Sequence, residues 1–97
     1  MRYRIALGRV LHDLRKGKRL TLRATSTLST ISMGYLSEVE RGRKEISSEL
    51  LDDLARVLGY QVYEIIIKTG FLMAGDSIPD TLESLLDEHA ELMVVSK

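Results

Sequence analysis

The chain has 97 residues, 44% of them hydrophobic and 29% charged, which suits one small folded domain and excludes wholesale disorder. It has no cysteine, so a disulfide scaffold, a cysteine nucleophile and a thiolate metal site are excluded. The formal net charge is zero, and because no run approaches the roughly 18 apolar residues of a membrane span, we expect a soluble, cytoplasmic protein.

Two helices are predicted near the N-terminus. Apolar residues recur at helical spacing over residues 5–16, and Gly17 is expected to end this first helix. Thr21 is placed to cap a short second helix over residues 22–29. That segment is poor in helix-forming residues, so tertiary packing must hold it.

A third helix is expected from Ser32, which is placed to cap it, to Glu40, with Gly42 ending it. The second and third helices then match a helix-turn-helix pattern, in which two short helices are joined by a tight turn. The pattern needs a small residue where the helices cross, an apolar residue in the turn and two inward residues on the second helix. These requirements are met by Ser26, Ile31, Leu36 and Val39.

Two more helices follow the motif. Residues 48–58 show the clearest amphipathic pattern in the chain, between a capping Ser47 and Gly59. A fifth helix is expected over residues 61–69; its three consecutive isoleucines would also suit a strand, but nothing nearby could pair with one. The predicted fold class is therefore all-α.

The composition changes after Gly70. A connector leads to Asp80 and Glu83, whose spacing is an aspartate variant of the capping box and opens an acidic sixth helix. Its leucines need to be covered, which favours a partner subunit, with a frayed tail as the alternative. We expect a helix-turn-helix domain over residues 1–68 and a C-terminal extension over residues 69–97, either a dimerisation helix or a tail.

The zero net charge conceals a gradient along the chain. Residues 1–44 carry a net charge of +8, residues 45–68 of −3 and residues 69–97 of −5. A basic segment beside an acidic remainder is common in nucleic-acid-binding proteins, although a basic stretch is often only a solvated face.

The run from Ile31 to Leu50, ISMGYLSEVERGRKEISSEL, resembles the repressor/Cro-type (XRE) helix-turn-helix regulators, and within them most the actinobacterial activators of Clp protease genes. The wider resemblance covers roughly residues 5–68 and implies a five-helix, lambda-repressor-like DNA-binding domain, usually dimeric. Two positions depart from the family pattern. Thr30 stands where a turn glycine is common, and Thr25 where a larger apolar residue is usual.

The resemblance also implies which residues bind DNA, with the exposed side of the third helix reading bases and the helix starts and loops contacting phosphates. The expected DNA-binding residues are Thr21, Arg23, Ser32, Met33, Gly34, Tyr35, Ser37, Glu38, Arg41, Arg43 and Lys44. Arg41 or Arg43 is suited to a bidentate guanine contact. Arg15 and Glu40 are expected to form a partly buried ion pair between the first and third helices.

A single recognition helix reads only a few base pairs, so specific regulation usually needs two half-sites and a symmetric dimer. Apolar residues beyond those a small bundle can bury predict the dimer interface. They are Val62, Ile65, Ile66, Phe71, Leu72, Leu82, Leu85 and Leu86. The expected function is a homodimeric, sequence-specific transcription regulator that binds a palindromic operator in double-stranded DNA.

Two other functions remain open: the antitoxin of a toxin–antitoxin pair, and an interaction module without DNA affinity. The resemblance adds RNA polymerase or a Clp protease as candidate partners. An enzymatic function is not expected, because His12 and His89 have no second histidine four residues on and no nucleophile in a glycine-rich turn nearby. No metal or cofactor is expected.

Overall fold

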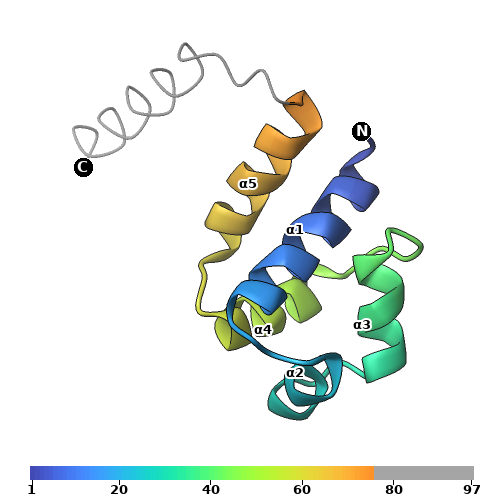
Figure 1. Cartoon of the computed structure of the whole chain (residues 1–97), viewed down its shortest axis with the longest axis vertical. Helices are drawn as coiled ribbons and strands as arrows, with labels where there is room; N and C mark the ends of the chain where they lie inside the picture. The colour runs from blue at the N-terminus through green and yellow to red at the C-terminus, as the bar shows by residue number, and fades with distance from the viewer. Residues whose placement is uncertain (76–97) are drawn as a thin grey trace, which may run out of the picture.

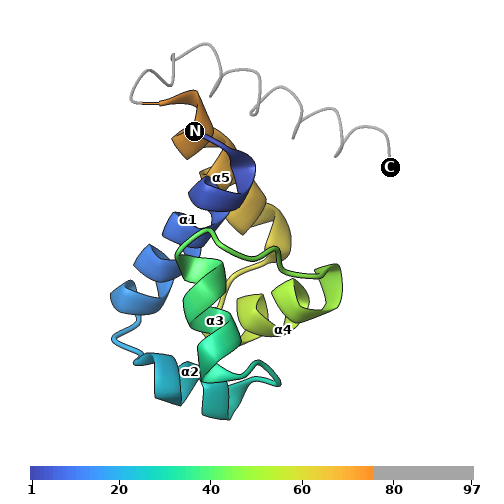
Figure 2. The same cartoon turned by 90° about the vertical axis from the view of Figure 1, so that its right-hand side faces the viewer.

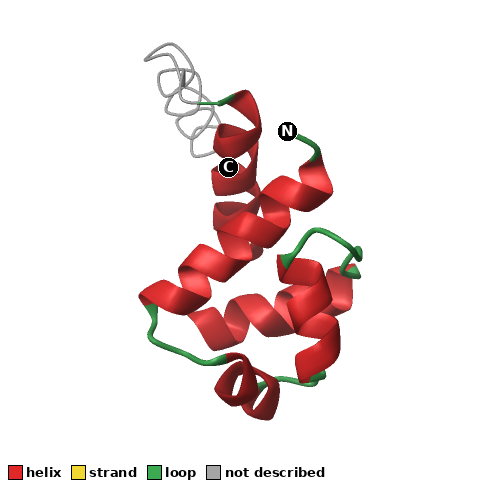
Figure 3. Cartoon of the chain, turned by 45° about the vertical axis from the view of Figure 1, so that its right-hand side comes forward, coloured by secondary structure: helices red, strands yellow, loops and turns green. Residues whose placement is uncertain are grey.

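In a computed structural model of the chain, residues 1–75 are described and form five α-helices (Figure 1 and Figure 3). Among these residues there is no strand, so the all-α prediction is confirmed. The predicted acidic sixth helix, with Leu82, Leu85, Leu86 and His89, lies outside the described residues. The five helices are α1 (Tyr3–Gly17), α2 (Leu22–Leu28), α3 (Met33–Glu40), α4 (Ser48–Leu58) and α5 (Val62–Ala74).

One apolar core joins the helices. Helices α1 and α5 lie side by side and run in opposite directions, and α3 packs against α1 and α2 (Figures 1 and 2). The fully buried side chains include Leu11 of α1, Leu36 of α3, Leu54 of α4 and Ile65 of α5. Because these residues come from four helices, the recognition helix α3 is seated on the same core that holds the rest of the bundle.

Three helices begin at the residues that the sequence marks as caps. The side-chain oxygens of Thr21, Ser32 and Ser47 each accept a hydrogen bond from the backbone N–H three residues further on, at 3.0, 3.2 and 3.2 Å. Such a cap stabilises a helix by about 1 kcal/mol. It matters most for α2, whose seven residues have weak helix propensity.

Helix α5 extends beyond its predicted end at Thr69 and reaches Ala74. The Thr69 side chain is fully buried, and its hydroxyl donates to the carbonyl oxygen of Ile65 at 2.7 Å. Leu72, one turn later, still packs against the core. The expected boundary after residue 68 therefore falls inside a helix, and the folded unit includes the rest of α5.

Helix α1 ends at Gly17, as the sequence predicts. In the turn that follows, Arg19 adopts the left-handed conformation with φ at 58°. A positive φ is uncommon for a residue with a side chain. The glycines that do take this conformation after helices are Gly42 and Gly59, where the sequence predicts helix ends.

Candidate nucleic-acid interface

The recognition helix α3 has one buried and one exposed side. Leu36 and Val39 are buried, as the helix-turn-helix pattern predicts. On the other side Ser32, Met33 and Gly34 are exposed, and Ser37 and Glu38 are half-buried. A Cβ atom placed on Gly34 would have no neighbour within 4 Å. The start of α3 therefore presents an exposed surface with small side chains at Ser32 and Gly34, of the kind that can enter the major groove of DNA.

Cationic side chains surround this surface. Arg23, in the first turn of α2, and Arg41, Arg43 and Lys44, in the loop after α3, are all exposed. The guanidinium of Arg43 lies 3.8 Å from Glu38 Oε2, a loose ion pair that lacks a hydrogen bond. Glu38 Oε2 is itself buried and has no hydrogen-bond partner among the described residues. The side chains of Arg43 and Glu38 are nevertheless 65% and 37% exposed, so the exposed parts of both can reach groups outside the protein.

The hydroxyl of Tyr35 is engaged within the protein. It donates a hydrogen bond to the backbone oxygen of Glu45 and so ties the loop after α3 to the helix. A phenol has one O–H to donate, and a phosphate oxygen needs a donor. In this arrangement the Tyr35 hydroxyl ties the loop that carries Arg43 and Lys44 to α3. The Thr21 and Ser32 oxygens accept cap hydrogen bonds and keep their own O–H free to donate.

Arg15 and Glu40 form a paired contact between α1 and the end of α3. Arg15 Nε lies 2.7 Å from Glu40 Oε2, and Arg15 Nη2 lies 2.9 Å from Oε1. Arg15 Nη1 also donates to the carbonyl oxygen of Leu20 at 2.8 Å. The side chains of the pair are only 9% and 6% exposed, and hydrogen bonding to Glu40 raises the pKa of Arg15. The structure thus places together the ion pair that the resemblance implies.

Gly8 allows α1 to approach this end of α3 closely, a feature that the sequence analysis missed. A Cβ atom at Gly8 would lie 2.4 Å from the carbonyl oxygen of Val39 and 2.7 Å from that of Glu40. Real Cβ atoms do not come so close to backbone oxygens, so only glycine fits without moving α3. A glycine inside a helical pattern was the available signal, because its cost in helix propensity implies a packing reason.

The two threonines that depart from the family pattern are both hydrogen-bonded. Thr25 is fully buried, and its hydroxyl donates to the Thr21 carbonyl oxygen at 2.9 Å. Thr30, in the turn between α2 and α3, donates through its N–H and its hydroxyl to Asp53 Oδ2, at 2.6 and 2.8 Å. No sequence signal pointed to Asp53, because it lies on α4, far from the turn along the chain.

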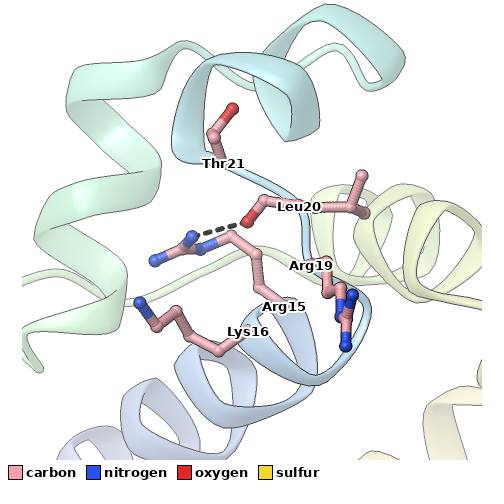
Figure 4. Close-up of a pocket in the computed structure, with 5 residues that line it drawn as sticks. All are labelled: Arg15, Lys16, Arg19, Leu20 and Thr21. Atoms are coloured by element: carbon pink, nitrogen blue, oxygen red, sulfur yellow. Dashed lines mark hydrogen bonds between the residues drawn. The ribbon is translucent and has the colours of Figure 1, made fainter.

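A basic pocket of about 310 Å³ lies beside the start of α2 (Figure 4). The side chains of Arg15 and Lys16 extend to the same side of the pocket, and Arg19 extends to the other. Lys16 and Arg19 are exposed and enlarge the cationic surface next to Thr21. The sequence shows these charges, but their spacing along the chain does not indicate that they lie near the expected DNA contacts.

Helix α5 carries most of the predicted dimer residues, and one of them is misplaced. Ile65 is fully buried in the core, so it cannot form an intersubunit contact. Val62, Phe71 and Leu72 are half-buried, and Ile66 is 40% exposed. The further exposed apolar side chains of α5 are Tyr63, Ile67 and Met73.

The requirements of a metal site and of a membrane-spanning helix can be compared with residues 1–75. No group of three or more metal-binding side chains occurs among them. His12 is exposed, with its Nδ1 atom 3.2 Å from Asp13 Oδ1. None of the described helices is long and apolar enough to span a bilayer.

Sequence comparisons relate this chain to transcriptional regulators. A helix-turn-helix domain family matches residues 6–64. The transcriptional regulator ClgR of Mycobacterium tuberculosis is 44% identical over 71 residues, which are 73% of this chain and 63% of the relative. The HTH-type regulator DdrOP3 of Deinococcus deserti is 32% identical over 82% of this chain and 64% of its own length. The chain thus spans a little under two thirds of these curated relatives.

Solved structures show the same architecture. The clp gene regulator ClgR of Corynebacterium glutamicum superposes with a TM-score of 0.74 at 38% identity, covering 99% of this chain and 95% of that one. The restriction-modification controller protein C.AhdI of Aeromonas hydrophila gives a TM-score of 0.61 at 30% identity, over 63% of this chain and 92% of that one. The expected resemblance to the Clp gene regulators is therefore confirmed.

Proposed function

We propose that this protein binds specific sequences in double-stranded DNA and regulates transcription. The chain belongs to the helix-turn-helix domain family, and its relatives are transcriptional regulators, which form a non-enzymatic family. The observation that carries this proposal is the exposed side of α3, flanked by Arg23, Arg41, Arg43 and Lys44. The helix can enter the major groove while the flanking cations contact the backbone.

Within this surface we assign base contacts to the exposed side of α3 and to Arg41 or Arg43. Arginine can donate two hydrogen bonds to guanine, and Glu38 can accept from cytosine. Lys44, Arg23 and the free O–H groups of Thr21 and Ser32 contact phosphates in this proposal. Lys16 and Arg19, which line the basic pocket, extend the phosphate-binding surface.

The experiment is a selection of bound duplexes from a random pool, followed by a salt titration of the selected site. Neutralisation of several phosphates makes the logarithm of the affinity fall linearly with the logarithm of the salt concentration. We expect an enriched motif and a steep salt dependence. A selected pool that stays random, or an affinity independent of salt, would contradict the proposal.

We further propose that the regulator is a homodimer on a palindromic operator, with α5 at the interface. The exposed Tyr63, Ile66, Ile67 and Met73 lie on a helix separate from the basic elements, so they can pair two copies without competing for DNA. In this proposal Val62, Phe71 and Leu72 lie at the edge of the dimer interface. The extension beyond Gly75 adds further contacts to the same interface.

The proposed dimer is tested by measuring the oligomeric state of the Ile66→Asp variant by analytical sedimentation, with Leu28→Asp as the matched control. Leu28 is 55% exposed on α2, so its substitution makes the same chemical change away from α5. We expect Ile66→Asp to shift the protein toward monomer and the selected motif to contain two half-sites. A truncation after Gly75 measures what the remaining residues add. A dimer that persists in Ile66→Asp would place the interface elsewhere.

A further inference from the structure

The turn between α2 and α3 is shaped by side-chain hydrogen bonds, without a glycine. Ser26 Oγ donates to the Ile31 carbonyl oxygen at 2.7 Å, and Ser29 Oγ accepts from the Ile31 N–H at 3.2 Å. The Thr30 N–H is bound by Asp53, as described above. The Leu28 carbonyl oxygen accepts from Arg56 Nη2 at 3.1 Å. Two of these bonds come from α4, which lies outside the helix-turn-helix motif.

Asp53 and Arg56 act as one unit on α4. Arg56 Nη2 lies 2.6 Å from Asp53 Oδ1, while Asp53 Oδ2 accepts both bonds from Thr30. The hydrogen bond from Arg56, followed by the two from Thr30, lowers the pKa of Asp53 to about 2. Asp53 is therefore a carboxylate at neutral pH, which strengthens the bonds to the turn.

Helix α4 is a firm anchor for these contacts. Its apolar residues Leu51, Leu54, Ala55 and Leu58 are all buried in the core. Helix α3 is thus held at both ends: Glu40 is bonded to α1, and the turn before α3 is bonded to α4. Loss of the contacts to α4 would remove the hydrogen bonds that fix the N-terminal end of α3 to this helix.

We propose that Asp53 and Arg56 are positioning residues for DNA recognition, which fix the turn to α4 and so set the angle at which α3 meets the major groove. The inference rests on the proposed function. Base contacts need side chains held close to their hydrogen-bonding geometry, whereas long exposed lysines and arginines can follow a phosphate through a small shift. Weakening the contacts to the turn should therefore reduce specificity before it reduces general DNA affinity.

The test compares Asp53→Asn with Asp52→Asn. Asp52 is the exposed neighbour on the same helix, so both variants remove one negative charge and change the attraction to phosphate alike. Affinities for the selected duplex and for a random duplex are measured over a salt series, after circular dichroism confirms folding. We expect Asp53→Asn to lower the specific affinity about tenfold relative to Asp52→Asn. The random-duplex affinity and the salt slope should match the control.

Thr30→Val is the second variant, and it keeps the proposal testable if Asp53→Asn folds poorly. It removes one hydroxyl bond to Asp53 and retains the N–H bond, so a smaller specific loss of about threefold is expected. The Thr30 amide proton supplies a spectroscopic readout. Its chemical shift should follow a titration with a pKa of about 2 in the wild type, and that titration should vanish in Asp53→Asn.

A purely structural role predicts a different result. Both variants would then melt at lower temperature and keep the wild-type ratio of specific to random affinity, which would overturn the inference. The inference would also be overturned if the chemical shift of the Thr30 amide proton titrated in the same way in the wild type and in Asp53→Asn. Failure of the wild type to select any sequence would contradict the proposed function itself, and the two failures are therefore distinguishable.

Discussion

Glu40→Ala should destabilise the domain severely, because it leaves the Arg15 guanidinium buried without its partner. Two hydrogen bonds join the pair, and the two side chains are 9% and 6% exposed. Breaking one side of such a pair costs about 3–5 kcal/mol. A unit of this size has a free energy of unfolding of roughly 4–11 kcal/mol at the usual value per residue. The substitution thus removes about a quarter of the stability or more.

Urea unfolding followed by circular dichroism measures this loss. With a slope of about 1–2 kcal/mol per molar urea for so small a domain, the midpoint should fall by at least about 1.5 M or the domain should be unfolded without urea. The double variant Arg15→Met with Glu40→Leu is the control, because it removes both charges together. Replacement of a buried pair by apolar side chains is often close to neutral.

The result that would refute this reasoning is specific. If Glu40→Ala loses less than about 1 kcal/mol, the pair is not the desolvated contact that its burial implies. If the double variant loses as much as the single one, then the damage comes from lost packing of the two side chains rather than from an unpaired buried charge.

Three other predictions follow from the same geometry. Arg43→Ala should weaken binding to the selected duplex by about 1–3 kcal/mol and relax the preference for one base, whereas Lys44→Ala should weaken binding to all duplexes and lower the salt slope by about one. Equal losses of affinity for the selected and the random duplex in both variants would contradict the assignment. Since its folded-state pKa lies below the unfolded value of 3.8, Asp53 contributes stability above pH 4 that is lost as the pH falls from about 4 to about 2. Acid unfolding of Asp53→Asn should show a smaller loss in this window. Gly8→Ala should destabilise the domain by about 1–3 kcal/mol through overpacking, while Gly34→Ala should stabilise the free protein by about 0.5–1 kcal/mol, and thermal melts of the two variants should move in opposite directions.

The sequence predicted those features that depend on neighbouring residues. Caps at Thr21, Ser32 and Ser47 and the buried positions of α3 follow from spacings of a few residues, and the structure agrees with them. The sequence predicts the end of α5 at Thr69, just before Gly70, whereas the helix continues to Ala74. A single exposed glycine costs a helix only about 1 kcal/mol, and the packing of Leu72 against the core outweighs it.

The contacts between distant elements were not predictable in the same way. Gly8 and Asp53 each act on a partner more than 20 residues away in the chain, and no periodicity records such a pairing. The sequence predicts Ile65 at a dimer interface because the fifth helix carries more apolar residues than a small bundle can bury. Only the position of the α5 axis against α1 decides which of the three isoleucines faces inward.

The dependence of the α2–α3 turn on α4 limits how this motif can be transplanted. A chimera that carries residues 21–44 into another helix-turn-helix scaffold would inherit the side chains proposed to contact bases. It would lack the Asp53 acceptor and the Arg56 donor on α4 that hold the turn before α3. Its operator preference would then follow the host framework as much as the grafted residues. Transfer of this protein's specificity therefore requires Asp53 and Arg56 to travel with the motif, which makes the minimal portable unit three helices instead of two.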